Sequence, residues 1–205
     1  MRQPPTHVVF DLGGVLIDWN PRHLYRDLIP DEAEMERFLE EVCTSAWNVE
    51  QDAGRSLAEA TAWLVGRHPD RRDLIEAFYD QFDRMMRDAI HETVAILEEL
   101  HARSTPLYLL SNASGETFHL VERRFAFLER FDGMLISGRE GMIKPDPAIF
   151  HLLCRRFDLQ PESCVFIDDS AANVESARAL GFHGHHFSKP ADLRRDLVAF
   201  GLLAS

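Results

Sequence analysis

Three short apolar runs, far apart along the chain, each end on a polar side chain. Residues 8–10 lead into Asp11, residues 107–110 into Ser111, and residues 165–167 into Asp168. Apolar runs of this length, bounded by polar residues and glycines, are typical of fully buried strands. Stretches with helical periodicity lie between them, and this alternation predicts an α/β fold with a parallel sheet and right-handed crossovers.

The expected elements follow from the same periodicity. Strands are predicted at residues 7–11, 106–111, 133–136, 163–168 and 182–187, and helices near 91–103, 114–125, 146–157, 171–180 and 191–203. In open parallel sheets, ligands bind beyond the carboxyl ends of the strands. Asp11, Ser111 and the pair Asp168–Asp169 lie at such ends, so we expect them to share one site.

Residues 19–87 interrupt the alternation with helical patterns and no convincing strand. Apolar residues recur three and four apart in three stripes: Met35, Phe38, Leu39 and Val42; Leu57, Thr61, Leu64 and Val65; and Leu74, Phe78, Phe82 and Met85. Such spacing predicts amphipathic helices, and Ser56 followed by Glu59 is a capping-box signature. We therefore predict a core domain of residues 1–18 and 88–205 and a helical domain of residues 19–87.

Charged groups accompany the predicted strand ends. A carboxylate such as Asp11 at the end of a buried strand costs several kcal/mol unless it is paired. Glycines directly after it permit a sharp turn and a close approach to a ligand. Lys144, which precedes a proline, supplies a cation. Asp168 and Asp169 would repel Asp11 without a further cation, and oxygen-only ligands suit Mg²⁺.

The order Asp11, Ser111, Lys144, Asp168–Asp169 resembles the haloacid dehalogenase-like (HAD) hydrolase superfamily, within its phosphatase branch. The resemblance implies a Rossmann-like parallel sheet with a small inserted helical cap, for which residues 19–87 are the candidate. It also implies a Mg²⁺-dependent phosphomonoesterase, in which Asp11 attacks phosphorus and water then cleaves the aspartyl-phosphate. The expected substrate is a small phosphorylated metabolite such as a sugar phosphate.

The resemblance further implies a role for each side chain of the predicted site. The metal is expected on Asp11, on the backbone carbonyl of Gly13 and on Asp169, with Asp168 and Asn173 in auxiliary positions. The phosphoryl group is expected on Ser111, Asn112 and Lys144. These groups would stabilise the charge that develops as Asp11 attacks. Independently of the resemblance, the aromatic face of Trp19 at the entry to the cap could hold the sugar of a substrate, although a packed hinge explains this residue equally well.

Gly13 departs from the usual pattern of the superfamily. Most phosphatases and mutases in it carry a second aspartate there, which acts as general acid and base. A subset that resembles bacterial sugar-phosphate phosphatases shares the Asp-Leu-Gly pattern of this chain. The general acid is therefore unassigned, with Asp18 and His23 as weak candidates, and a phosphomutase is disfavoured because it needs that group in both directions.

Three alternatives remain open. A 2-haloacid dehalogenase shares the aspartate nucleophile but attacks carbon without a metal, and it has no use for the pair Asp168–Asp169. A phospho-accepting receiver domain places its acidic pair before the acceptor aspartate, whereas here the pair comes last. A non-catalytic binding protein on the same scaffold is the third, although the intact Asp11, Lys144 and Asp169 argue against it.

Charge and composition limit the partners. The chain has 34 acidic and 22 basic residues and a formal net charge of −12, which disfavours nucleic acid and anionic membranes as partners. No apolar run reaches the length of a membrane span, and the N-terminus lacks the apolar region of a signal peptide. We expect a cytoplasmic enzyme, monomeric or a small homo-oligomer, without a nucleic-acid or membrane partner.

Overall fold

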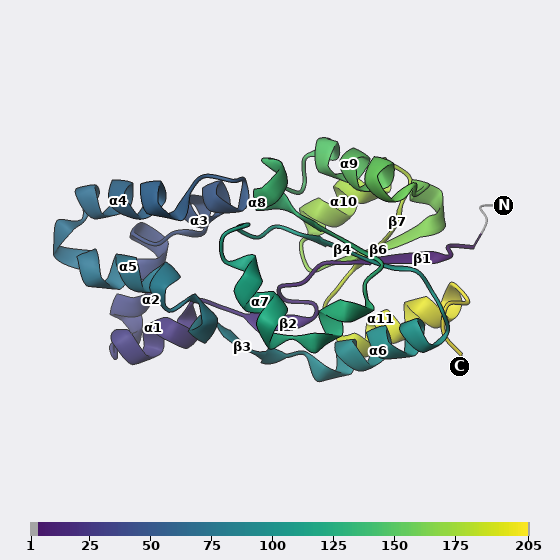
Figure 1. The fold of residues 1–205 in the computed structure, drawn as a ribbon. Helices are drawn as coiled ribbons and strands as arrows, with labels where there is room; N and C mark the ends of the chain where they lie inside the picture. Colours follow the sequence, from purple (N-terminus) through teal and green to yellow (C-terminus); the bar gives the residue numbers. More distant parts are fainter. Residues whose placement is uncertain (1–3, 205) are drawn as a thin grey trace.

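The computed structural model describes residues 4–204, and a five-stranded parallel sheet lies at its centre (Figure 1). Its strands are β1 (His7–Phe10), β4 (Leu107–Ser111), β5 (Gly133–Ile136), β6 (Cys164–Asp168) and β7 (His183–His186). They are ordered β5-β4-β1-β6-β7. The five predicted strands and the α/β class are therefore confirmed. Strand β1 is central, and the chain extends the sheet first on one side of it and then on the other.

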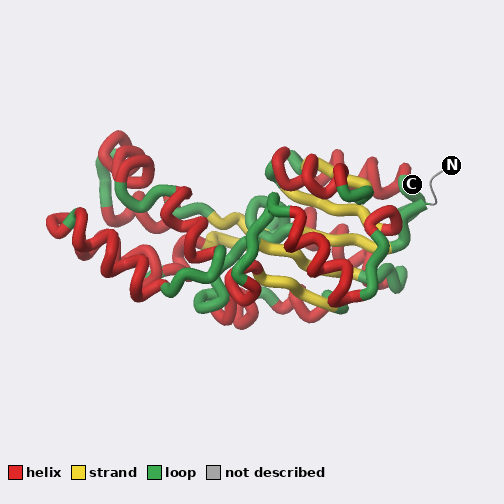
Figure 2. Tube along the Cα trace, turned by 90° about the horizontal axis from the view of Figure 1, so that it is seen from above, coloured by secondary structure: helices red, strands yellow, loops and turns green. Residues whose placement is uncertain are grey.

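Helices cover both faces of the sheet (Figures 1 and 2). One layer contains α6 (His91–Ala102), α7 (Phe118–Arg124) and α11 (Pro190–Ala199), and the other contains α9 (Pro147–Phe157) and α10 (Ala171–Ala179). Side chains alternate across a strand, so Val8 and Phe10 pack in the first layer while Val9 packs in the second. Burial on both faces explains why the strands are apolar throughout.

Two helices of this core differ from their predicted bounds. Helix α7 begins at Phe118 rather than near residue 114, because the Ser114 hydroxyl accepts the N–H of Glu116 in a turn that precedes the helix. Helix α11 ends at Ala199 rather than at residue 203, just before Gly201, whose φ of +78° is incompatible with a continuing helix. A short helix, α8 (Ser137–Glu140), follows β5 and was not predicted.

The inserted segment forms a helical unit beyond the sheet, at the left of Figure 1. Its helices are α1 (Arg22–Leu28), α2 (Glu32–Glu41), α3 (Ser45–Asp52), α4 (Leu57–Arg67) and α5 (Arg72–Asp80). A separate hydrophobic cluster, with Tyr25, Met35 and Phe78 fully or almost fully buried, holds them together. The Ser56 hydroxyl caps α4 by accepting the N–H of Glu59 at 3.3 Å, as the sequence predicted.

The prediction that residues 19–87 contain no strand is wrong. Strands β2 (Ile17–Trp19) and β3 (Met86–Ala89) pair antiparallel, with Ile17 opposite Ala89 and Trp19 opposite Met86. This ribbon carries the chain into and out of the helical unit, so both predicted domain boundaries fall within it. The strands are very short and β3 contains two exposed charged residues, so neither shows an alternating pattern.

Short 3₁₀ turns complete the structure: η1 (Pro69–Arg71), η2 (Phe82–Met85), η3 (Ala126–Arg130) and η4 (Pro161–Ser163). Phe82 and Met85 were predicted to continue the stripe of α5, but they lie in η2 because α5 ends at Asp80. None of the helices between residues 4 and 204 is long and apolar enough to cross a membrane.

Candidate active site

The site begins at the carboxyl end of β1. Asp11 directly follows this strand and stays in register with β6, because its N–H donates to the carbonyl of Ile167 at 2.8 Å. The strands on either side of β1 end on Ser111 and Asp168. The order of the sheet reverses around β1, and such a switch point is where open α/β sheets form a ligand-binding crevice.

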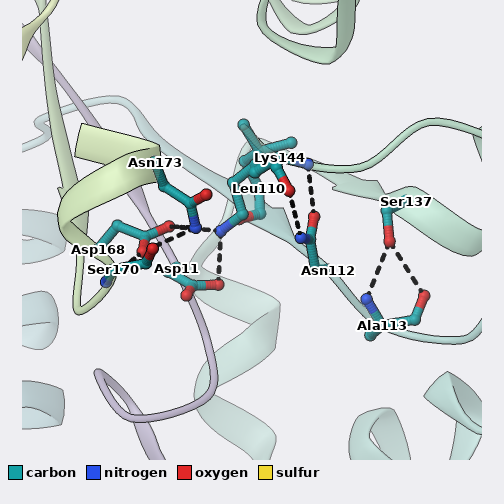
Figure 3. A network of polar contacts seen from close by, with 9 residues as sticks. All are labelled: Asp11, Leu110, Asn112, Ala113, Ser137, Lys144, Asp168, Ser170 and Asn173. Carbon is teal, nitrogen blue, oxygen red and sulfur yellow. Dashed lines mark hydrogen bonds and ion pairs between the residues drawn. The ribbon is translucent and has the colours of Figure 1, made fainter. Parts of the chain in front are cut away.

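Lys144 is the cation of this crevice (Figure 3). Its Nζ lies 2.9 Å from Oδ1 of Asp11, 2.6 Å from Oδ2 of Asp168 and 2.8 Å from the carbonyl oxygen of Leu110. An ammonium group has three donors, and each of them has an acceptor here. Burial alone would lower the pKa of Lys144, but the carboxylates of Asp11 and Asp168 raise it above the ordinary value. Lys144 is therefore a fixed positive charge against the Asp11 carboxylate.

Asn112 holds the backbone of Lys144. Its side-chain oxygen accepts the Lys144 N–H at 2.8 Å, and its Nδ2 donates to the Lys144 carbonyl at 2.9 Å (Figure 3). Because both ends of the amide engage the same residue, the loop that carries Lys144 is attached to the end of β4. Asn112 also lines the cavity described below, so it contacts both the lysine loop and the space for a substrate.

Asp168 and Asp169 are neighbours with different environments. Asp168 is fully buried: its Oδ1 accepts the N–H of Ser170 at 2.8 Å, and both of its oxygens accept from Nδ2 of Asn173 at 3.0 Å. Asp169 is exposed to solvent beside the turn after β1. Asp168 therefore supports Lys144, whereas Asp169 has its carboxylate free to face a ligand.

Gly14 lets Asp169 approach this turn. A Cβ atom at position 14 would lie 2.3 Å from Oδ2 of Asp169, and the φ of Gly14 is +73°. Both the close approach and the left-handed backbone require glycine. The second glycine after Asp11 thus serves the geometry of the acidic cluster.

The acidic cluster fits a hard cation. Carboxylate oxygens of Asp11, Asp168 and Asp169 lie within 4.8 Å of one another. Burial raises the pKa of Asp11, and Asp168 adds to the shift, although Lys144 opposes it. Three carboxylates around a single lysine leave excess negative charge, and oxygen-only ligands are those that Mg²⁺ prefers. The donor set and its charge therefore match a divalent cation of this kind.

A cavity of about 700 Å³ separates the strand ends from the helical unit. Its helical side is lined by residues of α1, α2, α3 and α5 and of the segments that precede α1 and α3. Its core side is lined by Asp11, Gly13, Gly14, Asn112, Lys144, Asp169 and Asn173. Trp19 also lines the cavity, and its buried indole N–H has no hydrogen-bond partner among residues 4–204. A smaller cavity of about 90 Å³ is lined by Ser111, and it shares Gly13, Trp19 and Asn112 with the larger one.

The two candidate acids named from the sequence do not line either cavity. Asp18 and His23 pair with each other instead, with Nε2 of His23 at 2.9 Å from Oδ1 of Asp18. Asp18 belongs to β2, where side chains alternate, so it points away from the face on which Trp19 reaches the cavity. Neither residue is positioned to protonate a leaving group.

Sequence reasoning missed Asp52 and Ser137. Asp52 ends α3 and lines both cavities, and its Oδ2 accepts from Nδ2 of Asn48 at 3.1 Å. Ser137 is fully buried, and its hydroxyl donates to the Asp52 carbonyl at 2.6 Å. The same hydroxyl accepts the Ala113 N–H at 3.0 Å (Figure 3). It ties α3 to the core. In the sequence Asp52 lies between two predicted helical stripes, outside any predicted helix, and no local signal distinguishes it.

Burial raises the pKa of Asp52 from 3.8 to about 7, and a hydrogen bond from the Ser114 backbone opposes the shift. The position adds to the effect of burial, since the partial negative charge at a helix C-terminus disfavours a carboxylate. Asp52 therefore retains its proton at pH values at which an exposed aspartate is fully ionised.

This shift predicts a pH-dependent difference in stability for Asp52→Asn. The folded protein binds the Asp52 proton more tightly than the unfolded chain, so the wild type loses stability as pH rises from about 4 to 7, by roughly 4 kcal/mol. The asparagine variant has no such loss. Its free energy of unfolding relative to the wild type should rise by about 2–3 kcal/mol between pH 5 and pH 8 in urea titrations. A difference that does not change with pH would contradict the raised pKa.

A family model of haloacid dehalogenase-like hydrolases matches residues 5–181. The chain belongs to this family. The match covers most of the core and all of the inserted helical unit, and it confirms the resemblance drawn from Asp11, Lys144 and Asp168–Asp169. The protein is therefore a HAD-like hydrolase, and an enzyme.

Curated relatives of this HAD-like hydrolase include phosphatases of two substrate types. A sesquiterpene phosphatase of Aspergillus oryzae is 25% identical over 186 residues, which are 88% of each chain. A D-ribitol-5-phosphate phosphatase of Bacteroides thetaiotaomicron is 22% identical over 203 residues, covering 94% of this chain and 96% of that protein. The similarity to bacterial sugar-phosphate phosphatases is thus confirmed.

Solved structures share the fold over nearly the whole chain. A HAD-like hydrolase of Porphyromonas gingivalis superposes with a TM-score of 0.73 at 25% identity, over 95% of this chain and 98% of that one. A HAD family enzyme of Bacteroides thetaiotaomicron, solved in complex with magnesium and inorganic phosphate, has a TM-score of 0.69 at 22% identity, over 90% and 94% of the chains. The helical unit is thus part of a shared architecture.

Proposed function

We propose that this HAD-like hydrolase is a Mg²⁺-dependent phosphomonoesterase that forms an aspartyl-phosphate on Asp11 and acts on a small phosphorylated metabolite. One observation carries the proposal: the carboxylate at the end of the central strand is paired with a fully buried lysine at 2.9 Å, and both line a cavity beneath a helical unit. The phosphatase relatives support this reaction class.

The side chains at the carboxyl ends of the strands each have a proposed role in this reaction. Asp11 attacks phosphorus in line with the leaving group. Lys144 places its charge beside the attacking oxygen and neutralises the phosphoryl group as it arrives. Asp168 and Asn112 keep Lys144 in place through its Nζ and its backbone. Ser111, at the edge of the smaller cavity, is proposed to donate its hydroxyl to a phosphoryl oxygen.

The proposed metal ligands are Asp11, the Gly13 carbonyl and Asp169, with Asp168 behind them. When bound, Mg²⁺ would neutralise charge on the phosphoryl oxygens and keep Asp11 ionised despite its burial. The magnesium and phosphate held by the structural relative from Bacteroides thetaiotaomicron support this choice of ion. The excess of carboxylates in the cluster favours a metal-dependent phosphatase over a metal-free dehalogenase.

The cavity favours a small polar substrate. Its volume of about 700 Å³ falls in the range of sites for single small molecules. The helical side of the cavity is lined by Trp19 and by polar side chains that can form hydrogen bonds with hydroxyl groups: Asn20, Thr44, Ser45 and Asn48. A sugar or polyol phosphate meets these groups better than a hydrocarbon chain does. Trp19, which lines the cavity, can stack against a sugar ring.

A phosphatase assay tests the proposal. Phosphate release is measured for a panel of sugar phosphates, polyol phosphates and nucleotides, each with Mg²⁺ and with a chelator. We expect turnover of at least one polar phosphate that stops when the metal is removed and returns when it is restored. Metal-independent release of halide from a 2-haloacid, with no phosphatase activity, would instead establish the dehalogenase alternative.

Metal binding has a readout that does not depend on turnover. Mg²⁺ at a hundredfold excess over its Kd should stabilise the folded protein by about 2.7 kcal/mol, because it binds the folded state alone. The rise in melting temperature should be lost in Asp169→Asn and kept in Asp192→Asn, which alters a half-buried carboxylate of α11 that pairs with Arg195 outside the site. An unchanged melting temperature of the wild type would argue against a metal site.

A further inference from the structure

We propose that Asp52, reaching over from the helical unit, is the general acid that protonates the leaving group in place of the aspartate missing at position 13. The inference rests on the proposed phosphatase function and assigns to it a residue outside the motifs of the core. It accounts for how a phosphatase with glycine at this position can expel a poor leaving group.

The first observation is an open space beside Gly13. A Cβ atom built at this position would have no neighbour within 4 Å, whereas one at Gly14 would collide with Asp169. The space that a side chain at position 13 would enter is therefore free of protein atoms. It forms part of the cavity that a leaving group would occupy.

The second observation is that Asp52 faces the same space. Asp52 and Gly13 both line the larger cavity, and both line the smaller cavity of about 90 Å³, so they lie close to each other across a confined volume. Glu40 is the other carboxyl group that the helical unit contributes to the larger cavity. It is solvent-exposed and does not line the smaller cavity, so Asp52 is the better placed acid.

The third observation is that Asp52 is held in position. Asn48 donates to its carboxyl group, and Ser137 of the core donates to its backbone carbonyl at 2.6 Å. The N–H of Leu57, a little further along the chain, donates to Glu116 of the loop after β4 at 3.0 Å. The C-terminal end of α3 is therefore attached to the core, which fixes the position of the Asp52 carboxyl group relative to the residues at the strand ends.

The surroundings of Asp52 keep it protonated near neutral pH. Several elements that pack around Asp52 carry polar or charged groups. They are Asn48 and Gln51 on α3, Arg55 after α3, Tyr79 on α5, Glu116 in the loop after β4 and Arg139 on α8. The charged groups across the cavity are Asp11, Lys144 and Asp169. Burial dominates and raises the pKa of Asp52 to about 7. A general acid works best when its pKa lies near the operating pH.

The proton balance closes over both steps. As Asp11 forms its bond to phosphorus, the bond to the leaving oxygen breaks, and Asp52 transfers its proton to that oxygen to release an alcohol. The Asp52 carboxylate then takes a proton from the water that attacks the aspartyl-phosphate. The bond between Asp11 and phosphorus breaks, inorganic phosphate leaves, and both side chains return to their starting states.

The test compares leaving groups in Asp52→Asn. Asparagine keeps the shape and can still accept the bonds from Asn48 and Ser114, so the fold should persist. For a simple alkyl phosphate, which needs a proton, single-turnover rates should fall about 100-fold or more, while for a dinitrophenyl phosphate they should change less than about threefold. The loss of rate with rising pH near 7 should also disappear for the alkyl substrate. Asp18→Asn, outside both cavities, is the matched control.

A second variant separates proton transfer from substrate binding. In Asp52→Asn combined with Gly13→Asp, the new carboxyl group enters the open space, and the alkyl phosphate rate should recover at least tenfold over Asp52→Asn alone. Equal losses for both leaving groups, or a higher KM with unchanged kcat, would overturn the proposal. If no variant, including the wild type, cleaves the dinitrophenyl ester, the phosphatase function itself fails.

Discussion

Asp11→Asn should lower the single-turnover rate of phosphate release at least about a thousandfold, the scale seen when a nucleophile is removed. The amide keeps the shape of the side chain but cannot attack phosphorus. It also removes a charge from the pair with Lys144 and from the proposed metal site. The rate is measured by rapid quench with the best substrate of the panel.

Two further results complete this test. Wild-type protein quenched in acid during turnover should carry one phosphoryl group on a peptide that contains Asp11, and Asp11→Asn should carry none. Asp27→Asn, which removes an exposed carboxylate that pairs with Arg84, should react at the wild-type rate. Retention of most of the activity in Asp11→Asn would rule out the covalent mechanism.

Lys144→Met should reduce stability by about 3–5 kcal/mol and abolish activity. The methionine fills a similar volume, but it leaves the Asp11 and Asp168 carboxylates in the interior without their cation. Without Lys144, which lowers the pKa of Asp11, this buried carboxyl group would be driven further towards protonation. Since the folded state would bind more protons than the unfolded state, the loss of stability should be greater at pH 8 than at pH 5.

The chain provides a matched control for this variant. It contains two lysines, and each precedes a proline: Lys144 and Lys189. The Lys189 side chain is 65% exposed and lies 3.6 Å from Asp192, so Lys189→Met should change the free energy of unfolding by less than about 1 kcal/mol. Urea unfolding of the three proteins at both pH values provides the comparison. Equal stability of the two variants would show that the buried cluster does not depend on Lys144.

The core of the fold could be predicted because its signals are local. A strand buried on both faces must be apolar throughout, so residues 8–10 and 165–167 identify β1 and β6 without any partner being known. The polar residue that ends each run marks an edge of the sheet, and parallel strands bring these edges together. Asp11, Ser111 and Asp168 were expected in one place for this reason, whereas the place of Lys144 followed from the family resemblance. Asp11 and Asp168 meet at the ammonium group of Lys144.

Elements stabilised by contacts between distant segments were harder to predict. Strands β2 and β3 consist of three and four residues, and they exist because two distant segments pair with each other, with Ile17 opposite Ala89 and Trp19 opposite Met86. Local periodicity carries no information about such a pairing. The late start of α7 has a different, local cause, because the Ser114 hydroxyl accepts the N–H of Glu116 in a turn instead of capping a helix.

Burial and turn formation leave local patterns, so the family, the α/β core and the order of charged groups at the strand ends can be inferred from the residues alone. Which groups face the cavity depends on contacts between distant segments. In the folded chain Asp18 and His23 pair with each other outside the cavity, Asp168 binds Lys144, and Asp52 lines the same small cavity as Gly13. Burial and proximity determine the reactivity of a side chain, and both depend on how the helical unit packs over the sheet.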